Sequence, residues 1–173
     1  MPVSLYDATV ANFQQGVAAL EAILGRAPAH FEAQGKPLAE IVGARLAPDM
    51  LPFSFQVVSA AHHSLGAIHG ARAGLFKPPA RAEGLDLAAL QALLAQAREG
   101  LAALGRDEVN ALAGRDVVFE LGERRMPFVA EDFLLSFSVP NFYFHLATAY
   151  GLLRQHGMPL GKRDYLGRLR LKS

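Results

Sequence analysis

The sequence predicts an all-α fold, with four long helices packed as a bundle in one domain over residues 1–173, short extra helices, and a small β-hairpin before the last helix. Three observations predict it. Apolar residues recur at alternating steps of three and four along separate stretches, as in helices with one buried face. Hydrophobic residues make up 51% of the chain and charged residues 19%, enough apolar surface for one core. Two short β-rich runs stand together late in the chain.

The first long helix is predicted over about residues 5–27. Ser4 and Asp7 form an S-x-x-D signal that is typical of an N-terminal cap. We expect Pro28 to interrupt this helix, because proline removes a backbone donor and crowds the preceding turn. A further short helical piece is expected between residues 37 and 46. The apolar stripe of the first helix consists of Val10, Phe13, Val17, Leu20 and Leu24.

The second long helix is predicted over about residues 50–73. It is expected to open near Asp49, with Pro52 in its first turn, where a missing backbone donor costs little. Gln56 and His63 lie on a stripe next to the main one. That main stripe consists of Leu51, Phe55, Val58, His62, Leu65 and His69.

An irregular connection is expected around residues 77–79. Asp86 is then expected to cap a third long helix over about residues 86–104, whose leucine stripe is the most regular in the chain. Two β-rich runs predict a hairpin over about residues 117–129. Pro127 indicates that the second strand lies at an exposed edge, since proline cannot donate to a neighbouring strand.

The last long helix is predicted over about residues 131–156. Gly157 marks its end and a C-terminal tail covers residues 157–173. Pro140 lies inside this helix, so we expect a kink or a local break there. Irregular backbone inside a bundle core often marks a site, although packing alone also produces it.

Composition excludes several classes of function. The chain has no cysteine, which removes disulfides, zinc ribbons and thiol nucleophiles. Its net charge of +1 comes from 17 basic and 16 acidic residues, a balance that argues against nucleic acid as a partner. We find no signal peptide and no apolar run long enough for a bilayer, so no membrane partner and a cytoplasmic location are expected.

The strongest candidate site is a polar cluster next to Pro140 in the last helix. It contains Asn141, Tyr143 and His145, and bundle sites are built from such side chains on facing helices. One interpretation is a pocket in which His145 is a ligand or general base. The other, which we favour, is that the buried histidine and asparagine satisfy backbone groups freed by the proline.

Two further sets were weighed in the same way. Asp49 is either a carboxylate at the mouth of the bundle or, by preference, a helix cap. His62 and His69 lie two turns apart and face either a cleft or a dimer partner or, by preference, solvent at the C-terminal end of the stripe. His62 and His63 cannot chelate one ion together on a regular helix, because neighbouring side chains diverge by about 100°.

Four segments carry a resemblance to a known family. They are Val3–Asp7, Ala44–Met50, Pro140–His145 and Gly161–Gly167, in that order along the chain. The sequence resembles the bacterial domain of unknown function nineteen-ninety-three over nearly its whole length. This resemblance implies a DinB/YfiT-like helical bundle. Members of that superfamily are often homodimers, often bind a divalent metal such as zinc or nickel, and include thiol-dependent transferases and hydrolases.

The metal motif of that superfamily has one histidine on the second long helix and an H-x-x-x-H pair on the last. Residues four apart share a helical face and can bind one ion. This sequence departs from the motif, because Asn141 lies four residues before His145 and Ala149 four residues after it. Near the start of the second helix stands Gln56. Amide oxygens are weak zinc ligands, so His145 is the best single candidate ligand and no triad is expected.

The sequence therefore supports three hypotheses of function. The first is a bundle that binds a small molecule or a helical partner in a pocket near His145. The second is a metal-dependent DinB-like transferase or hydrolase, with Gln56, Asn141 or a displaced histidine completing the metal shell. The third is a homodimeric scaffold without catalysis.

Overall fold

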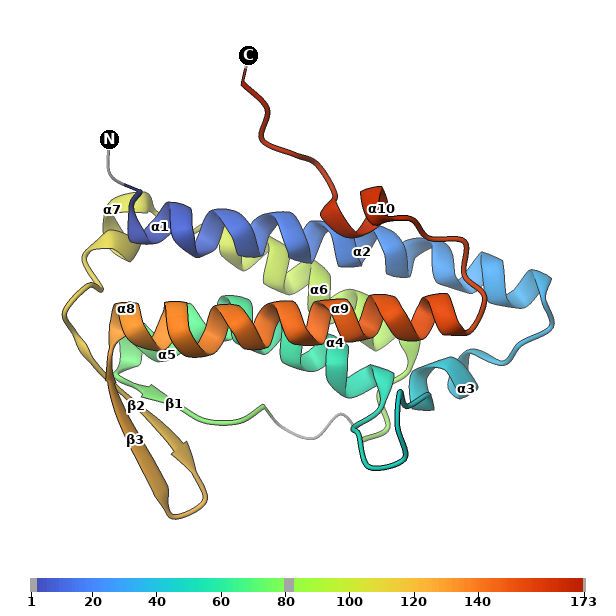
Figure 1. The fold of residues 1–173 in the computed structure, drawn as a ribbon, viewed down its shortest axis with the longest axis horizontal. Helices are drawn as coiled ribbons and strands as arrows, with labels where there is room; N and C mark the ends of the chain where they lie inside the picture. The colour runs from blue at the N-terminus through green and yellow to red at the C-terminus, as the bar shows by residue number, and fades with distance from the viewer. Residues whose placement is uncertain (1–2, 80–82, 173) are drawn as a thin grey trace.

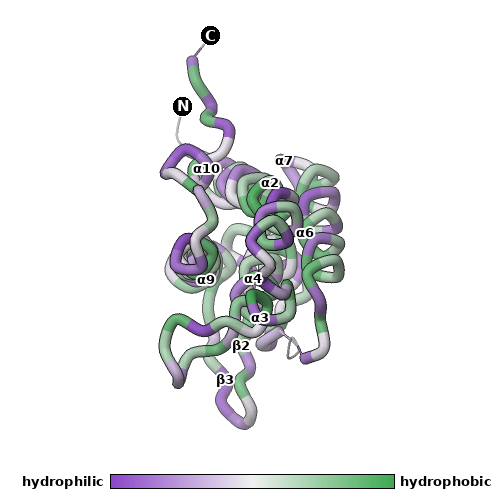
Figure 2. Tube along the Cα trace, turned by 90° about the vertical axis from the view of Figure 1, so that its right-hand side faces the viewer, coloured by the Kyte–Doolittle hydropathy of each residue, from purple (hydrophilic) through white to green (hydrophobic). Residues whose placement is uncertain are grey.

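The computed structural model describes residues 3–79 and 83–172, and it is mostly helical (Figure 1). Four long helical segments run side by side around a shared core, as the end-on view in Figure 2 shows. None of the helices in the described ranges is long and apolar enough to cross a membrane. The long segments are α1 (Leu5–Ala8) with α2 (Val10–Ala33), α4 (Phe53–Ala61) with η1 (His62–Gly66) and α5 (Ala67–Ala73), α6 (Leu87–Ala102), and α8 (Ala130–Asp132) with η2 (Phe133–Ser138) and α9 (Val139–Gln155).

Short helices pack on the long segments. They are α3 (Leu38–Gly43), which packs against α4, α7 (Arg106–Asn110), which packs against α1, and α10 (Lys162–Leu166), which lies along the side of α2 (Figure 1). Inside the bundle α4 packs against α9, and α2 against α6. The core is aromatic in character, and its largest fully buried side chains include Phe13, Phe31, Phe53, Phe133 and Phe142.

The close approach of α2 and α9 depends on one glycine. A Cβ atom at Gly16 would lie 2.7 Å from Cζ of Phe142, so no larger residue fits beneath that ring. The ring also meets Phe13 edge-on, with 5.0 Å between centroids. The glycine therefore lets the last helix pack directly on the first.

The first helix runs past Pro28, so the predicted interruption there is wrong. Helix α2 continues to Ala33. Ala27 and Phe31, on either side of the proline, are fully buried. Their packing offsets the cost of about 3 kcal/mol that a proline imposes in a helix interior. The predicted cap is confirmed, because the Ser4 hydroxyl accepts a hydrogen bond from the Asp7 amide at 3.2 Å.

The second long helix begins at Phe53, so the predicted start near Asp49 is wrong. Pro52 is the extended residue before the helix, and Asp49 is an exposed turn residue. The amide of Met50 bonds the carbonyl of Ala47, which closes a turn instead of a helix. Asp49 therefore caps nothing in this fold.

A three-stranded sheet corrects the all-α label. Strands β2 (Asp116–Leu121) and β3 (Arg124–Val129) form the expected antiparallel hairpin. Strand β1 (Leu75–Phe76) pairs in parallel with β2 and was not predicted, whereas the irregular connection predicted at residues 77–79 is confirmed. Two residues are too few to show the alternation by which strands are recognised. Pro127 lies on β3, which is an edge strand as expected.

Two π-helical segments interrupt the long helices, and they are neighbours in space. One is η1 in the second helix and the other is η2, just before Pro140 in the last helix. The irregular backbone predicted near Pro140 is thus present, as a π-helical stretch inside a continuous helical rod (Figure 1). Such segments occur frequently at functional sites.

The N-terminal cap of α6 provides a first test of the fold. The Asp86 carboxylate accepts a hydrogen bond from the Ala89 amide at 2.8 Å, as predicted. Asp86→Ala is expected to lower the free energy of unfolding by about 1 kcal/mol in urea titrations. Asp86→Asn, which keeps an acceptor oxygen, serves as the control. Equal losses in both variants would contradict a capping role.

Candidate functional site

The best-defined polar contact in the core joins the second long helix to the last. The His145 side chain on α9 is 9% exposed. Its Nδ1 lies 2.8 Å from Oε1 of Gln56 on α4. Gln56 is itself buried, and its Nε2 donates to the carbonyl of Leu51 at 2.9 Å. These hydrogen bonds connect the start of α4 with the middle of α9.

The same chain of hydrogen bonds fixes which nitrogen of His145 carries the proton. The Leu51 carbonyl can only accept, so the amide nitrogen of Gln56 faces it and the amide oxygen faces His145. An amide oxygen can only accept, so Nδ1 of His145 donates. The Nε2 atom of the neutral ring is left with its lone pair. It has no hydrogen-bond partner among the described residues, so it can accept a proton or bind a ligand.

A second imidazole lies against the first. His63, in η1, is 6% exposed, and its ring centroid is 5.9 Å from that of His145, with the two planes 17° apart. Its Nδ1 is buried and finds no hydrogen-bond partner in the described structure. A buried polar atom without a partner costs about 1–3 kcal/mol, so its presence calls for an explanation.

Both imidazoles are neutral at physiological pH. Burial lowers the pKa of His145 from 6.5 to about 4. Burial and, to a smaller extent, the nearby His145 and His62 rings lower the pKa of His63 to about 3. Neutral imidazole is the form that accepts protons and binds metals.

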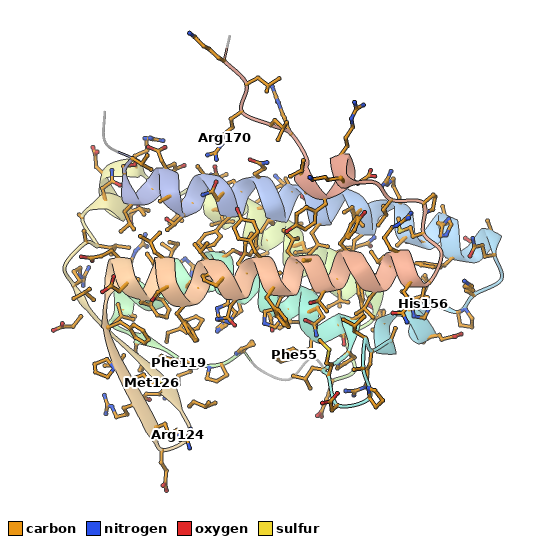
Figure 3. The ribbon with its side chains drawn as sticks, in the orientation of Figure 1. Phe55, Phe119, Arg124, Met126, His156 and Arg170 are labelled. Atoms are coloured by element: carbon orange, nitrogen blue, oxygen red, sulfur yellow. The ribbon has the colours of Figure 1, made fainter. Side chains whose placement is uncertain are left out.

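Aromatic side chains enclose the pair. Phe55 and Phe144 meet His145 edge-on, at 6.0 and 5.2 Å between centroids, and Phe137 meets His63 in the same way at 5.5 Å. Phe119 of the hairpin packs on Phe137 at 4.7 Å. In Figure 3, Phe55 and Phe119 lie along the same edge of α9. The sheet therefore extends the aromatic wall of the site.

Two buried hydroxyls lie on the same helical segments. Ser59 is three residues after Gln56 and four before His63, and its Oγ has no partner among the described residues. The Oγ of Ser138, at the end of η2, is also buried without a hydrogen-bond partner among the described residues. Buried hydroxyls without partners are uncommon, so these two mark the interface of the second and last helices as unusually polar.

The structure brings together two of the five predicted site residues. Gln56 and His145 are in contact, as described above. Asn141 donates to the backbone carbonyl of Phe137 at 2.7 Å, whereas His145 bonds the Gln56 side chain, so the backbone role that we favoured for the two residues is wrong for His145. Tyr143 is 38% exposed and lines a small cavity with Tyr165, away from His145. Asp49 is exposed in its turn.

Sequence reasoning missed His63 as a site residue. It was placed on the stripe of Gln56, seven residues earlier, and that spacing was the available signal. His69, on the main stripe, is exposed as expected. His62 is half-buried, its ring centroid is 5.9 Å from that of His63, and both rings contact Phe76.

The donor set was compared with the requirements of a metal centre. Within residues 3–79 and 83–172, no three histidine or acidic side chains are grouped to hold an ion. The Gln56 oxygen is already engaged by His145. The two imidazoles could supply part of a coordination shell, but a three-ligand site is not formed by these residues.

Comparison with known proteins agrees with this fold. The chain resembles the solved structure of a DinB family member protein from Shewanella denitrificans, with 26% identity and a TM-score of 0.80. The match covers 98% of this chain and 95% of that one. The chain belongs to the family of the domain of unknown function DUF1993, which matches residues 5–166. Both the predicted family and its DinB-like relationship are confirmed. No curated protein matches.

Replacing Gln56 tests the hydrogen-bond chain. In Gln56→Leu the Nδ1 proton of His145 loses its acceptor, so we expect a mixture of tautomers and a loss of about 1–3 kcal/mol in the free energy of unfolding. The imidazole ¹⁵N shifts of His145 measure the tautomer. Gln91→Leu is a matched control, because it removes a glutamine that donates to the Leu24 carbonyl far along the chain from His145. An unchanged Nδ1 proton in Gln56→Leu would contradict the assignment.

Proposed function

We propose that this protein binds a small molecule between the second and last long helices of a four-helix bundle, at His145 and His63. The observation that carries the proposal is the buried, neutral His63–His145 pair, whose ring nitrogens are not all satisfied by described residues. A ligand group with a hydrogen-bond donor would supply the partner that Nε2 of His145 lacks.

The side chains around His63 and His145 indicate which kind of ligand would fit between them. The rings of Phe55, Phe137 and Phe144 favour a flat or apolar body. No carboxylate or ammonium group contacts either imidazole in the described structure, which disfavours a charged ligand. The class that fits best is a neutral molecule with an apolar body and one hydroxyl or amide donor.

The test is a titration followed at the imidazole nitrogens. Protein labelled with ¹⁵N-histidine is titrated with benzyl alcohol, phenol and benzamide. We expect the Nε2 resonance of His145 to move on binding while Nδ1 stays protonated, and no response in His145→Phe. His69→Ala is the control, because it removes an exposed histidine of the same second helix. Shifts that persist in His145→Phe, or no shift with any of the three probes, would overturn the proposal.

A second candidate is a metal-dependent transferase or hydrolase of the DinB-like kind. Its support is the His63–His145 pair together with the DinB-named structural neighbour. Ligating histidines usually donate their other nitrogen to a fixed acceptor, as His145 does to Gln56. Zinc or nickel suits imidazole nitrogen. A third ligand would have to come from outside this pair, because no group of three histidine or acidic side chains that could hold an ion is present among the described residues.

Elemental analysis separates the two candidates. The protein is purified without a histidine tag, and its metal content is measured before and after incubation with zinc, nickel and manganese. Stoichiometric metal that is lost in His145→Ala and kept in His69→Ala would support the metal-dependent enzyme. Absence of metal under every condition would remove it.

Homodimer formation is proposed as a separate property of the last helix. Phe144 is 55% exposed and Leu135 is 44% exposed, both on segments of this helix. Exposed apolar side chains of this size are common at contacts between subunits. Light scattering coupled to size exclusion would detect the dimer, and a monomer at working concentration would exclude it.

A further inference from the structure

A separate cavity lies beside the second long helix, and neither His63 nor His145 is among its described lining residues. Its volume is about 480 Å³, within the range of small-molecule pockets. It lies between the second helix, α6 and the connection that follows β1. The lining residues are Val58, Ala61, His62, Leu65, Gly66, Pro78, Pro79, Leu85, Leu93, Gln96 and Ala97.

His62 supplies the polar feature of this wall. Its Nε2 lies 2.7 Å from the carbonyl oxygen of Lys77, which can only accept, so Nε2 carries the proton. The ring stacks on Phe76, with 4.5 Å between centroids and 26° between planes. The ring is thus held on two sides, and Nδ1 keeps its lone pair. No described residue hydrogen-bonds to that atom.

Gly66 keeps this nitrogen uncovered. A Cβ atom at position 66 would lie 2.9 Å from Nδ1 of His62. Both residues line the cavity, so the lone pair lies at the cavity wall, where a side chain on residue 66 would displace the ring. The glycine and the π-helical turn that contains it together shape this part of the wall.

The remaining lining is neutral and largely aliphatic. No acidic or basic side chain other than the imidazole is among the described lining residues. Burial lowers the pKa of His62, which disfavours the charged imidazolium. A charged ligand would lose its hydration here without a counter-charge, whereas a neutral apolar ligand would not.

We propose that this cavity is a binding site for a neutral, apolar small molecule whose hydroxyl group donates a hydrogen bond to Nδ1 of His62. The site is distinct from the one proposed above, because neither His63 nor His145 is among its described lining residues, although the His62 ring is 5.9 Å from that of His63.

The test uses two probes of similar shape. 1-Naphthol carries the hydroxyl donor, and 1-methoxynaphthalene lacks it. Binding is measured by calorimetry and by the ¹⁵N shift of the His62 ring. We expect 1-naphthol to bind the wild-type protein about 3- to 10-fold more tightly, the ratio that one net hydrogen bond gives. His62→Phe keeps a ring against Phe76 and is expected to bind both probes equally.

A variant that fills the cavity tests whether the probes bind there. Gln96 is an exposed residue of α6 that lines the cavity, so Gln96→Trp is expected to abolish binding of both probes. Glu99→Trp, also exposed on α6 but outside the lining, is the matched control and is expected to bind normally. Circular dichroism establishes that each variant is folded. Equal affinities of the two probes for the wild type, binding that survives Gln96→Trp, or no binding at millimolar probe would each overturn the proposal.

Discussion

Lowering the pH from 7.5 to 4.5 is expected to reduce the free energy of unfolding by on the order of 3–5 kcal/mol. The cause is the buried histidine pair. In the unfolded chain these rings titrate near 6.5, whereas in the fold the pKa is about 4 for His145 and about 3 for His63. Between those values the unfolded state binds more protons, so acid favours unfolding. The stabilisation is complete above pH 6.5 and declines as the pH falls below it.

Urea titrations at several pH values between 7.5 and 4.5 measure this effect. The lowered carboxyl pKa values of Asp7 and Asp164 act mainly below this window, and that of Glu131 acts only at its lower end. Burial also lowers the pKa of His62, so His62 adds to the effect of the pair. His63→Phe should lose a measurable part of the acid sensitivity. His69→Ala should keep all of it. Parallel pH profiles for wild type and His63→Phe would show that the pair does not stay neutral in the fold.

Phe142→Ala is expected to lower the free energy of unfolding by about 3–5 kcal/mol. The ring is fully buried between α2 and α9, where it contacts Phe13 and covers Gly16. Its removal leaves a cavity that the rigid helices cannot close. For a chain of this size the midpoint of thermal unfolding should fall by on the order of 10 °C, measurable by calorimetry.

Two further variants test whether the loss of stability comes from the buried contact between Phe142 and Gly16. Phe144→Ala removes the same ring from an exposed position on the same helix, and should change stability by less than about 1 kcal/mol. Gly16→Ala should destabilise the wild type, because its Cβ would meet the Phe142 ring at 2.7 Å. In Phe142→Ala the same substitution should be neutral or stabilising. Additive effects in the double variant would contradict direct packing of the two residues.

The helices could be predicted from the sequence where one local signal dominates. The stripes of leucine and phenylalanine located the long segments, and the caps at Ser4 and Asp86 were correct because a capping side chain acts on backbone only three residues away. The errors came from tertiary contacts. Pro28 stays inside a helix because the residues on either side of it are buried in the core. Leu75–Phe76 forms a strand only because it pairs with β2, which lies far along the chain.

Part of the candidate site was also predictable from local signals in the sequence. His145 and Gln56 were singled out as polar residues on inward stripes, and their hydrogen bond joins them. His63 was overlooked although its spacing placed it on the Gln56 stripe, because its contact with His145 forms only when the second and last helices pack. The free nitrogen of His62 could not be foreseen, since it depends on the Lys77 carbonyl, which reaches the ring only in the folded chain.

The two π-helical segments have a consequence for how these helices tolerate changes in length. A π-helical turn accommodates one residue more than an α-helical path requires. Removing a single residue from η1 would restore the ordinary period and leave the two flanking helices facing nearly the same way, because the wide turn already absorbs that residue. A single-residue deletion in α4, where no wide turn absorbs it, would instead rotate Gln56 by about 100° relative to the residues that follow. The orientation of Gln56 toward His145 is therefore sensitive to a deletion in α4 and insensitive to one in η1.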